Sequence, residues 1–85
     1  MNEALPTRER LRWQCRRGML ELDLVLSAYL ESRYSNLDDA GKQRFVDLLS
    51  VDDPTLNAWM FGNQSPVDAE MVAVIADVLS AAVEN

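Results

Sequence analysis

The sequence predicts an all-α protein: a compact five-helix bundle with a short fourth helix, formed by a single helical domain over residues 1–85. Every long segment places apolar residues three and four positions apart, the spacing of a helix with one buried face. Helix-capping residues, glycine or proline separate these segments. No alternation of apolar and polar residues persists over five positions beside a hairpin turn, so no strand is predicted. A chain of 85 residues can bury one modest core.

The first predicted helix begins after Thr7, a good N-cap, and runs through about Arg17. Leu11 and Cys15 lie four residues apart on its inner face. Gly18 fits the position just after the helix, because glycine adopts positive φ without steric cost. We therefore expect the chain to bend at Gly18 before a second helix begins.

The second and third helices follow from clear apolar stripes. The second is predicted from about Met19 to Tyr34, ending at Ser35-Asn36. The third is predicted from an N-cap at Asp38 to near Ser50. The stripe of the second helix contains Met19, Leu22, Leu26, Tyr29 and Leu30, and the inner face of the third contains Phe45, Leu48 and Leu49.

Proline marks the start of the last two predicted helices. Asp53-Pro54 reads as an N-cap followed by proline in the first turn, where the missing N–H has no cost. This short helix should end at Gly62-Asn63. The run 65–68 (Ser-Pro-Val-Asp) resembles a capping box and starts the fifth helix. The buried residues expected are Leu56, Trp59 and Met60 in the fourth helix, and Met71, Ile75, Val78, Leu79 and Ala82 in the fifth.

Composition indicates a cytoplasmic protein that does not insert into membranes. No apolar run reaches the roughly 18–20 residues of a membrane span, and the N-terminus lacks the apolar core of a secretory signal. The single cysteine fits a reducing compartment. The net charge of −6 is uneven, since residues 1–17 carry five arginines against two glutamates. The acidic remainder disfavours non-specific binding to nucleic acid.

The residue types needed for familiar catalytic sites are missing, so we expect that the protein is not an enzyme. The chain has no histidine, which excludes histidine-activated nucleophiles and histidine metal ligands. Its three glycines form neither a phosphate-cradling loop nor a dinucleotide fingerprint. Asp52 and Asp53 fit a helix start, with Asp53 as the cap, better than a metal site. Cys15 is expected to be a buried small apolar residue.

The candidate binding residues surround Gly18. Arg16, Arg17 and Glu21 place both charge signs next to a residue without a side chain, an arrangement that can approach another protein closely. A structural reading is also open, because arginines at one helix end and acids at the next helix start satisfy the two helix dipoles. Trp13 is equally open to a core role or an interface role, since tryptophan and arginine together are typical of binding hot spots.

Two ordered sequence blocks resemble a known family. Residues 12–23 (RWQCRRGMLELD) are similar to the block W-x-C-R-R-G-M-x-E-L-D, and residues 48–60 are similar to L-L-x-x-x-D-D-P-D-L-x-x-W-L. These blocks belong to the succinate dehydrogenase flavinylation factors, or FAD assembly factors. Thr55, Met60 and Arg12 depart from the pattern, but none of them touches the R-G-x-x-E signature.

The resemblance implies a five-helix chaperone that binds the flavoprotein subunit of succinate dehydrogenase and promotes covalent attachment of FAD to a histidine of that subunit. It also implies the fumarate reductase flavoprotein as a related client. No cofactor is expected to stay bound to this chain, which should act as a monomer. Arg17 and Glu21 would contact the client, Gly18 would permit close approach, and Arg16 and Trp13 would support the contact. The alternative is a small helical nucleic-acid-binding or regulatory adaptor that uses the arginine-rich first helix.

Overall fold

Helices follow one another along residues 5–84, the part of the chain that the computed structural model describes. No strand occurs within this range, so the all-α prediction is confirmed. The fourth helix is short, as predicted, but the first is shorter still. The elements are α1 (Arg8–Gln14), α2 (Leu20–Ser32), the 3₁₀ turn η1 (Tyr34–Asn36), α3 (Asp39–Leu49), α4 (Asp53–Phe61) and α5 (Ala69–Glu84).

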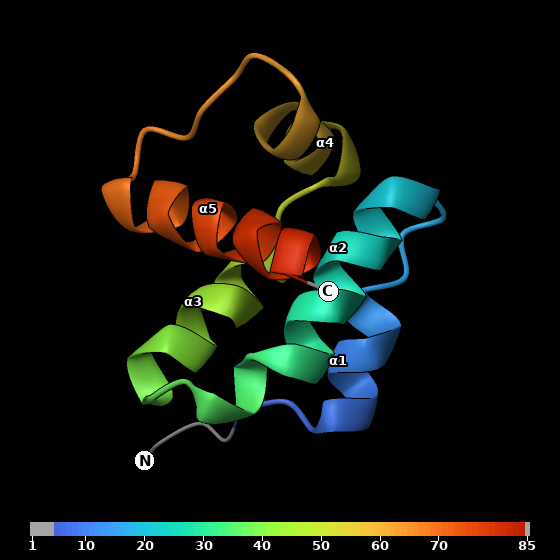
Figure 1. Cartoon of the computed structure of the whole chain (residues 1–85), viewed down its shortest axis with the longest axis vertical. Coiled ribbons are helices and arrows are strands. Elements are labelled where there is room, and N and C mark those ends of the chain that lie inside the picture. The colour runs from blue at the N-terminus through green and yellow to red at the C-terminus, as the bar shows by residue number, and fades with distance from the viewer. Residues whose placement is uncertain (1–4, 85) are drawn as a thin grey trace.

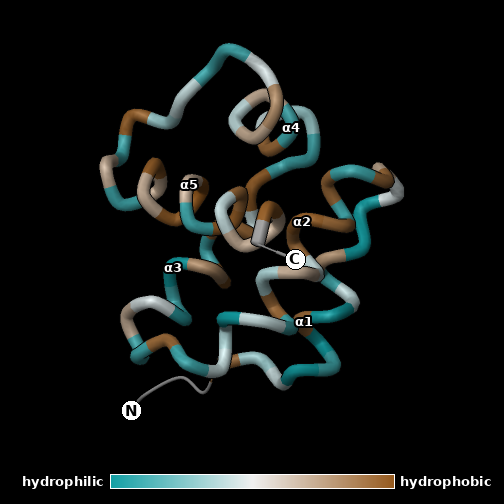
Figure 2. The backbone as a smooth tube through the Cα atoms, viewed as in Figure 1, coloured by the Kyte–Doolittle hydropathy of each residue, from teal (hydrophilic) through white to brown (hydrophobic). Residues whose placement is uncertain are grey.

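The helices pack around α2 and α5, the two longest. Figure 1 shows α5 crossing the middle of the molecule, with α4 on one side of it and α3 on the other. α2 packs most extensively against α5 and also contacts α1 and α4. Figure 2 shows α1 as a mainly hydrophilic helix, whereas α2 and α5 carry longer hydrophobic stretches. The α1–α2 pair therefore forms one edge of the bundle, with the turn between them at its end.

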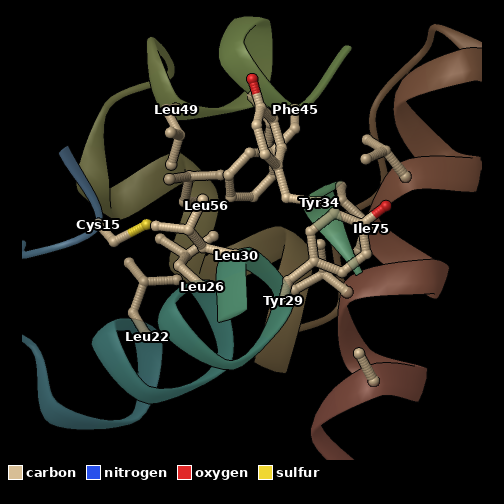
Figure 3. Packing of buried hydrophobic residues seen from close by; sticks show 14 of the residues in the cluster. Cys15, Leu22, Leu26, Tyr29, Leu30, Tyr34, Phe45, Leu49, Leu56 and Ile75 are labelled. Carbon is tan, nitrogen blue, oxygen red and sulfur yellow. The ribbon is translucent and has the colours of Figure 1, made fainter. Parts of the chain in front are cut away.

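The core is a single cluster to which all five α-helices contribute or against which they pack. Figure 3 shows its centre, where Phe45 of α3 lies between two tyrosines: its ring centroid is 5.1 Å from that of Tyr29 and 5.6 Å from that of Tyr34. Such tilted aromatic pairs add to the stabilisation from buried area. The predicted inner faces of the second and third helices are confirmed, and Trp59 packs against the cluster while staying half-buried.

The fifth helix buries a slightly different face from the predicted one. Ile75 and Val78 are buried as expected, but Val74 and Ala81 are buried as well, while Ala82 is only half-buried. The physical reason is that α5 packs against α2, α3 and α4 together, so its contact face is wider than one narrow stripe.

The first helix ends at Gln14, three residues earlier than predicted, and Cys15 is its C-cap. The backbone N–H of Arg17 donates to a carboxylate of α2 instead of continuing the helix. Gly18 has the expected positive φ of 77°, but it lies in the turn and not directly after the helix cap. The second helix ends at Ser32, and Tyr34 enters η1 and packs against Phe45.

In two helices, the residue that caps the N-terminus is a neighbour of the predicted one in the sequence. Asp52, not Asp53, caps α4: its side chain accepts the Thr55 N–H and the Thr55 hydroxyl, which lowers the pKa of Asp52. α5 begins at Ala69 instead of near Ser65, because the Asp68 carboxylate accepts the N–H of Glu70. A carboxylate is the stronger acceptor at the positive end of a helix. The predicted caps Thr7 and Asp38 are confirmed.

Because Cys15 is buried, we expect the free energy of unfolding to fall as the pH rises through the alkaline range. Burial raises the pKa of the Cys15 thiol from 9.0 to about 11. Between these values the unfolded chain binds fewer protons than the folded chain, so the free energy of unfolding falls as pH rises, by up to about 1.4 kcal/mol per pH unit. Urea unfolding from pH 8 to 11 should therefore show a steeper decline for the natural chain than for Cys15→Ala. Equal slopes would contradict this assignment.

Candidate functional site

The turn between α1 and α2, residues 15–19, presents Gly18 at an open apex. Gly18 is exposed, and apart from Gly18 and its two chain neighbours no described atom lies within 4 Å of the position that a Cβ would occupy there. It is the one residue of the described range 5–84 with positive φ, a conformation that glycine adopts without strain. The apex is therefore free of neighbouring side chains and accessible to another molecule.

Asp23 holds this turn from the first turns of α2. Its Oδ1 accepts the backbone N–H of Arg17 at 2.7 Å, and its Oδ2 accepts that of Gly18 at 3.3 Å. Hydrogen bonds from backbone N–H groups to a carboxylate are stronger than those to neutral acceptors. One side chain thus satisfies two consecutive backbone donors of the turn.

The Arg17 side chain points into the bundle, so the expectation that it faces outward is wrong. Its side chain is 12% exposed, and its guanidinium donates to Asp53 Oδ1 at 2.9 Å. Its planar fork, which offers five donors, reaches acceptors on two separate segments. The remaining acceptors are backbone carbonyls: Gln14 at 2.7 Å, Val51 at 3.1 Å, and Leu49. Arg17 therefore ties the α1–α2 turn to the α3–α4 turn.

The other candidate residues lie on the outside of the same turn. Trp13 is 72% exposed, which settles its open assignment in favour of the surface. The Arg16 guanidinium lies 5.8 Å from the Trp13 ring centroid, a cation–π arrangement. Glu21 is exposed, and its carboxylate has no hydrogen-bond or ion-pair partner within residues 5–84. The turn brings Trp13, Arg16, Gly18 and Glu21 together in one short exposed stretch.

Two exposed leucines next to the turn were missed by sequence reasoning. Leu20 is 75% exposed and Leu24 is 59% exposed. They lie four residues apart on α2, out of phase with the buried stripe that contains Leu22 and Leu26. That phase is visible in the sequence and could have identified them. Contiguous exposed apolar residues mark surfaces that bind other molecules.

Three of the five N-terminal arginines are already engaged within the fold. Arg8 donates to the Leu30 carbonyl at 2.9 Å and to Glu31 at 3.5 Å, and Arg12 donates to Glu31 at 3.2 Å. Hydrogen bonding from Arg12, together with Arg8, lowers the pKa of Glu31. Arg17 is the third, through its internal contacts. The basic surface of the first helix is therefore smaller than its composition indicates.

Asp52, Asp53 and Cys15, the other residues considered for a chemical role, have structural roles. Asp52 caps α4 and Asp53 binds Arg17, while Cys15 is fully buried as predicted. Within residues 5–84, no group of three His, Cys, Asp or Glu side chains is placed to hold a metal ion. No described helix is both long and apolar enough to cross a membrane.

Replacing Arg17 should destabilise the fold far more than replacing its neighbour. Arg17→Ala leaves Asp53 and three backbone carbonyls without their donor, which should lower the free energy of unfolding by about 2–3 kcal/mol. Arg17→Lys keeps the charge but lacks the fork and should fall in between. Arg16→Ala, the matched exposed control, should change stability by less than about 0.5 kcal/mol. Urea denaturation measures all three, and similar losses for Arg16→Ala and Arg17→Ala would refute the internal role.

Comparison with known proteins places the whole bundle in one family. Residues 9–82 match the family model described as flavinator of succinate dehydrogenase, a range that includes the α1–α2 turn. The FAD assembly factor SdhE of Idiomarina loihiensis is 44% identical over 78 residues, which cover 92% of this chain and 87% of that relative.

Two further relatives bear the same name. The FAD assembly factor SdhE of Photobacterium profundum is 46% identical over 68 residues, covering 76% of this chain and 77% of the relative. That of Coxiella burnetii is 38% identical over 78 residues, covering 92% of this chain and 94% of the relative. The chain therefore belongs to the family of flavinators of succinate dehydrogenase.

Proposed function

We propose that this chain is an assembly factor that binds the flavoprotein subunit of succinate dehydrogenase and promotes covalent attachment of FAD to it. The observation that carries the proposal is the family match over residues 9–82, which spans every described helix except the first residue of α1 and the last two of α5. The exposed turn at Gly18 supports it, because an apex without side chains suits close approach to a partner.

The proposed docking surface consists of residues from the end of α1 and the start of α2: Trp13, Arg16, Gly18, Leu20, Glu21 and Leu24. Leu20, Leu24 and Glu31 fall on one side of α2, since eleven residues span about three turns. Arg12 of α1 binds Glu31, so α1 runs along that side. Arg16 lies in the turn that follows α1 and leads to Leu20. In this docking surface, the apolar side chains of Leu20 and Leu24 accompany the opposite charges of Arg16 and Glu21.

In this proposal the factor orients its client, and the covalent chemistry takes place in the client. The bond to FAD forms on a histidine of the flavoprotein subunit. Holding reacting groups in a productive arrangement can lower a barrier by several kcal/mol, about 7–11 in the best cases. Arg16 and Glu21 contact the client directly, Gly18 permits close approach, and Arg17 supports the turn from inside through Asp53.

The proposal extends to the finer assignments made from the sequence. The fumarate reductase flavoprotein is a second client. The chain folds as a single domain over residues 1–85 and acts as a monomer in the cytoplasm. A role as a nucleic-acid-binding module is disfavoured, because the guanidiniums of Arg8, Arg12 and Arg17 donate to acceptors within the chain. Few basic groups of the first helix are then left to bind phosphates.

Substituting Gly18 by a small residue and by a large one should distinguish backbone strain within this chain from steric obstruction of the client. Gly18→Ala and Gly18→Arg both force an L-residue to a φ of 77°, at a cost of about 1–2 kcal/mol each. Neither meets an atom of this chain within 4 Å of its Cβ, so their thermal stabilities should be alike. Only the arginine obstructs the client. We expect covalent FAD on the flavoprotein to be lost with Gly18→Arg and largely retained with Gly18→Ala.

The measurement is flavin fluorescence in a denaturing gel, after co-expression of each variant with the flavoprotein in cells that lack their own factor. The natural chain must restore the covalent flavin for the proposed function to stand. If Gly18→Arg loads the flavoprotein as well as Gly18→Ala does, the apex is not a contact point.

Trp13→Ala should weaken client binding without loss of stability. Because 72% of Trp13 is exposed, its removal should change the free energy of unfolding by less than about 0.5 kcal/mol. A buried tryptophan at an interface contributes about 2 kcal/mol or more, so the Kd for the flavoprotein should rise about thirtyfold. Val67→Ala, an exposed apolar residue in the α4–α5 loop, is the control and should leave the Kd unchanged. Calorimetric titration would contradict the prediction if the two variants bound equally.

A further inference from the structure

We propose that Asp23 is a positioning residue for the docking surface: it fixes the direction of the chain at Gly18 and so presents Glu21 and Arg16 in one arrangement before the client binds. The inference rests on the proposed function and names the residue that prepares its site. Asp23 itself faces the turn, since both its carboxylate oxygens accept backbone N–H groups of that turn.

The turn has few other restraints of its own. Beyond the α1 cap, its backbone–backbone hydrogen bonds join the Arg16 N–H to the Trp13 carbonyl at 3.0 Å and, at the start of α2, the Asp23 N–H to the Met19 carbonyl at 2.8 Å. The next two N–H groups, of Arg17 and Gly18, both depend on Asp23. Glycine has the largest conformational freedom of any residue. Without Asp23, the peptide at the apex would sample many directions, and fixing it would then oppose client binding.

The two ends of Arg17 are held by different parts of the fold. Its backbone N–H binds Asp23 of α2 at 2.7 Å, and its guanidinium binds Asp53 at the start of α4 at 2.9 Å. The side-chain anchor keeps the base of the turn in place when Asp23 is changed. Loss of the Asp23 carboxylate should therefore free Gly18 while the bundle remains folded.

The test compares Asp23→Ala with Asp38→Ala, a matched change at the N-cap of α3. The Asp38 carboxylate also accepts one backbone N–H, that of Gly41 at 2.8 Å, but it caps α3 away from the docking surface. Asp23→Ala loses two carboxylate-to-backbone hydrogen bonds, the second a longer one of 3.3 Å, and Asp38→Ala loses one, so both variants should be less stable than the natural chain. Only Asp23→Ala should weaken binding to the flavoprotein subunit of succinate dehydrogenase, about tenfold.

Two additional measurements distinguish positioning from general stability. Asp23→Asn keeps one acceptor oxygen for two donors, so its Kd should lie between those of the natural chain and Asp23→Ala. Amide hydrogen exchange at Arg17 and Gly18 should accelerate in Asp23→Ala and stay unchanged in Asp38→Ala. All binding measurements use purified full-length chains well below the unfolding temperature.

The outcomes separate the two proposals. If the natural chain does not bind the flavoprotein subunit, the proposed function fails. If the natural chain binds and Asp23→Ala binds with the same Kd, the proposed function stands and the positioning role of Asp23 is overturned. Equal weakening by Asp38→Ala would likewise overturn it, because the effect would then follow stability alone.

Discussion

The placement of one guanidinium governs the geometry of this bundle's edge. Arg17 lies three residues after the end of α1, and its side chain reaches Leu49, Val51 and Asp53 across the α3–α4 turn. A charge with so little exposure is tolerated only where acceptors satisfy its donors, and here a carboxylate and three carbonyls do so. The α1–α2 turn therefore cannot move independently of the α3–α4 turn. The position of the exposed apex at Gly18 follows from that tie.

Within a few residues the chain separates supporting side chains from presenting ones. Arg17 and Asp23 direct their polar atoms inward to the turn and the bundle, while Arg16 and Glu21 remain exposed. Arg17 and Asp23 thus have structural roles. The binding role is what we propose for Arg16 and Glu21. The same division explains why Asp52 caps α4: Asp53 is occupied by Arg17, and Asp52 is left to accept the Thr55 N–H.

Local patterns in the sequence were sufficient for most of the fold and for part of the site. Apolar spacing identified the buried faces of α2 and α3, and short polar side chains identified the caps Thr7 and Asp38, because both signals arise within one or two turns of helix. The inward turn of Arg17 was not predictable in this way, since its acceptors lie 32 to 36 residues further along the chain. The exposed leucines of α2 were predictable from the sequence, because Leu20 and Leu24 are out of phase with the buried stripe of Leu22 and Leu26.

A factor that works by orienting its client needs a contact surface that is stiffer than the client itself. If the contact surface were a mobile loop, ordering it would cost part of the binding free energy. Less binding free energy would then remain to favour one arrangement of the client. The turn at Gly18 avoids this loss, since Asp23 and Arg17 hold it from two sides while the apex stays open. Arg16 and Glu21 then place opposite charges on either side of the apex. Complementary charges of this kind set orientation more than they add affinity, which agrees with the proposed role of orienting the client.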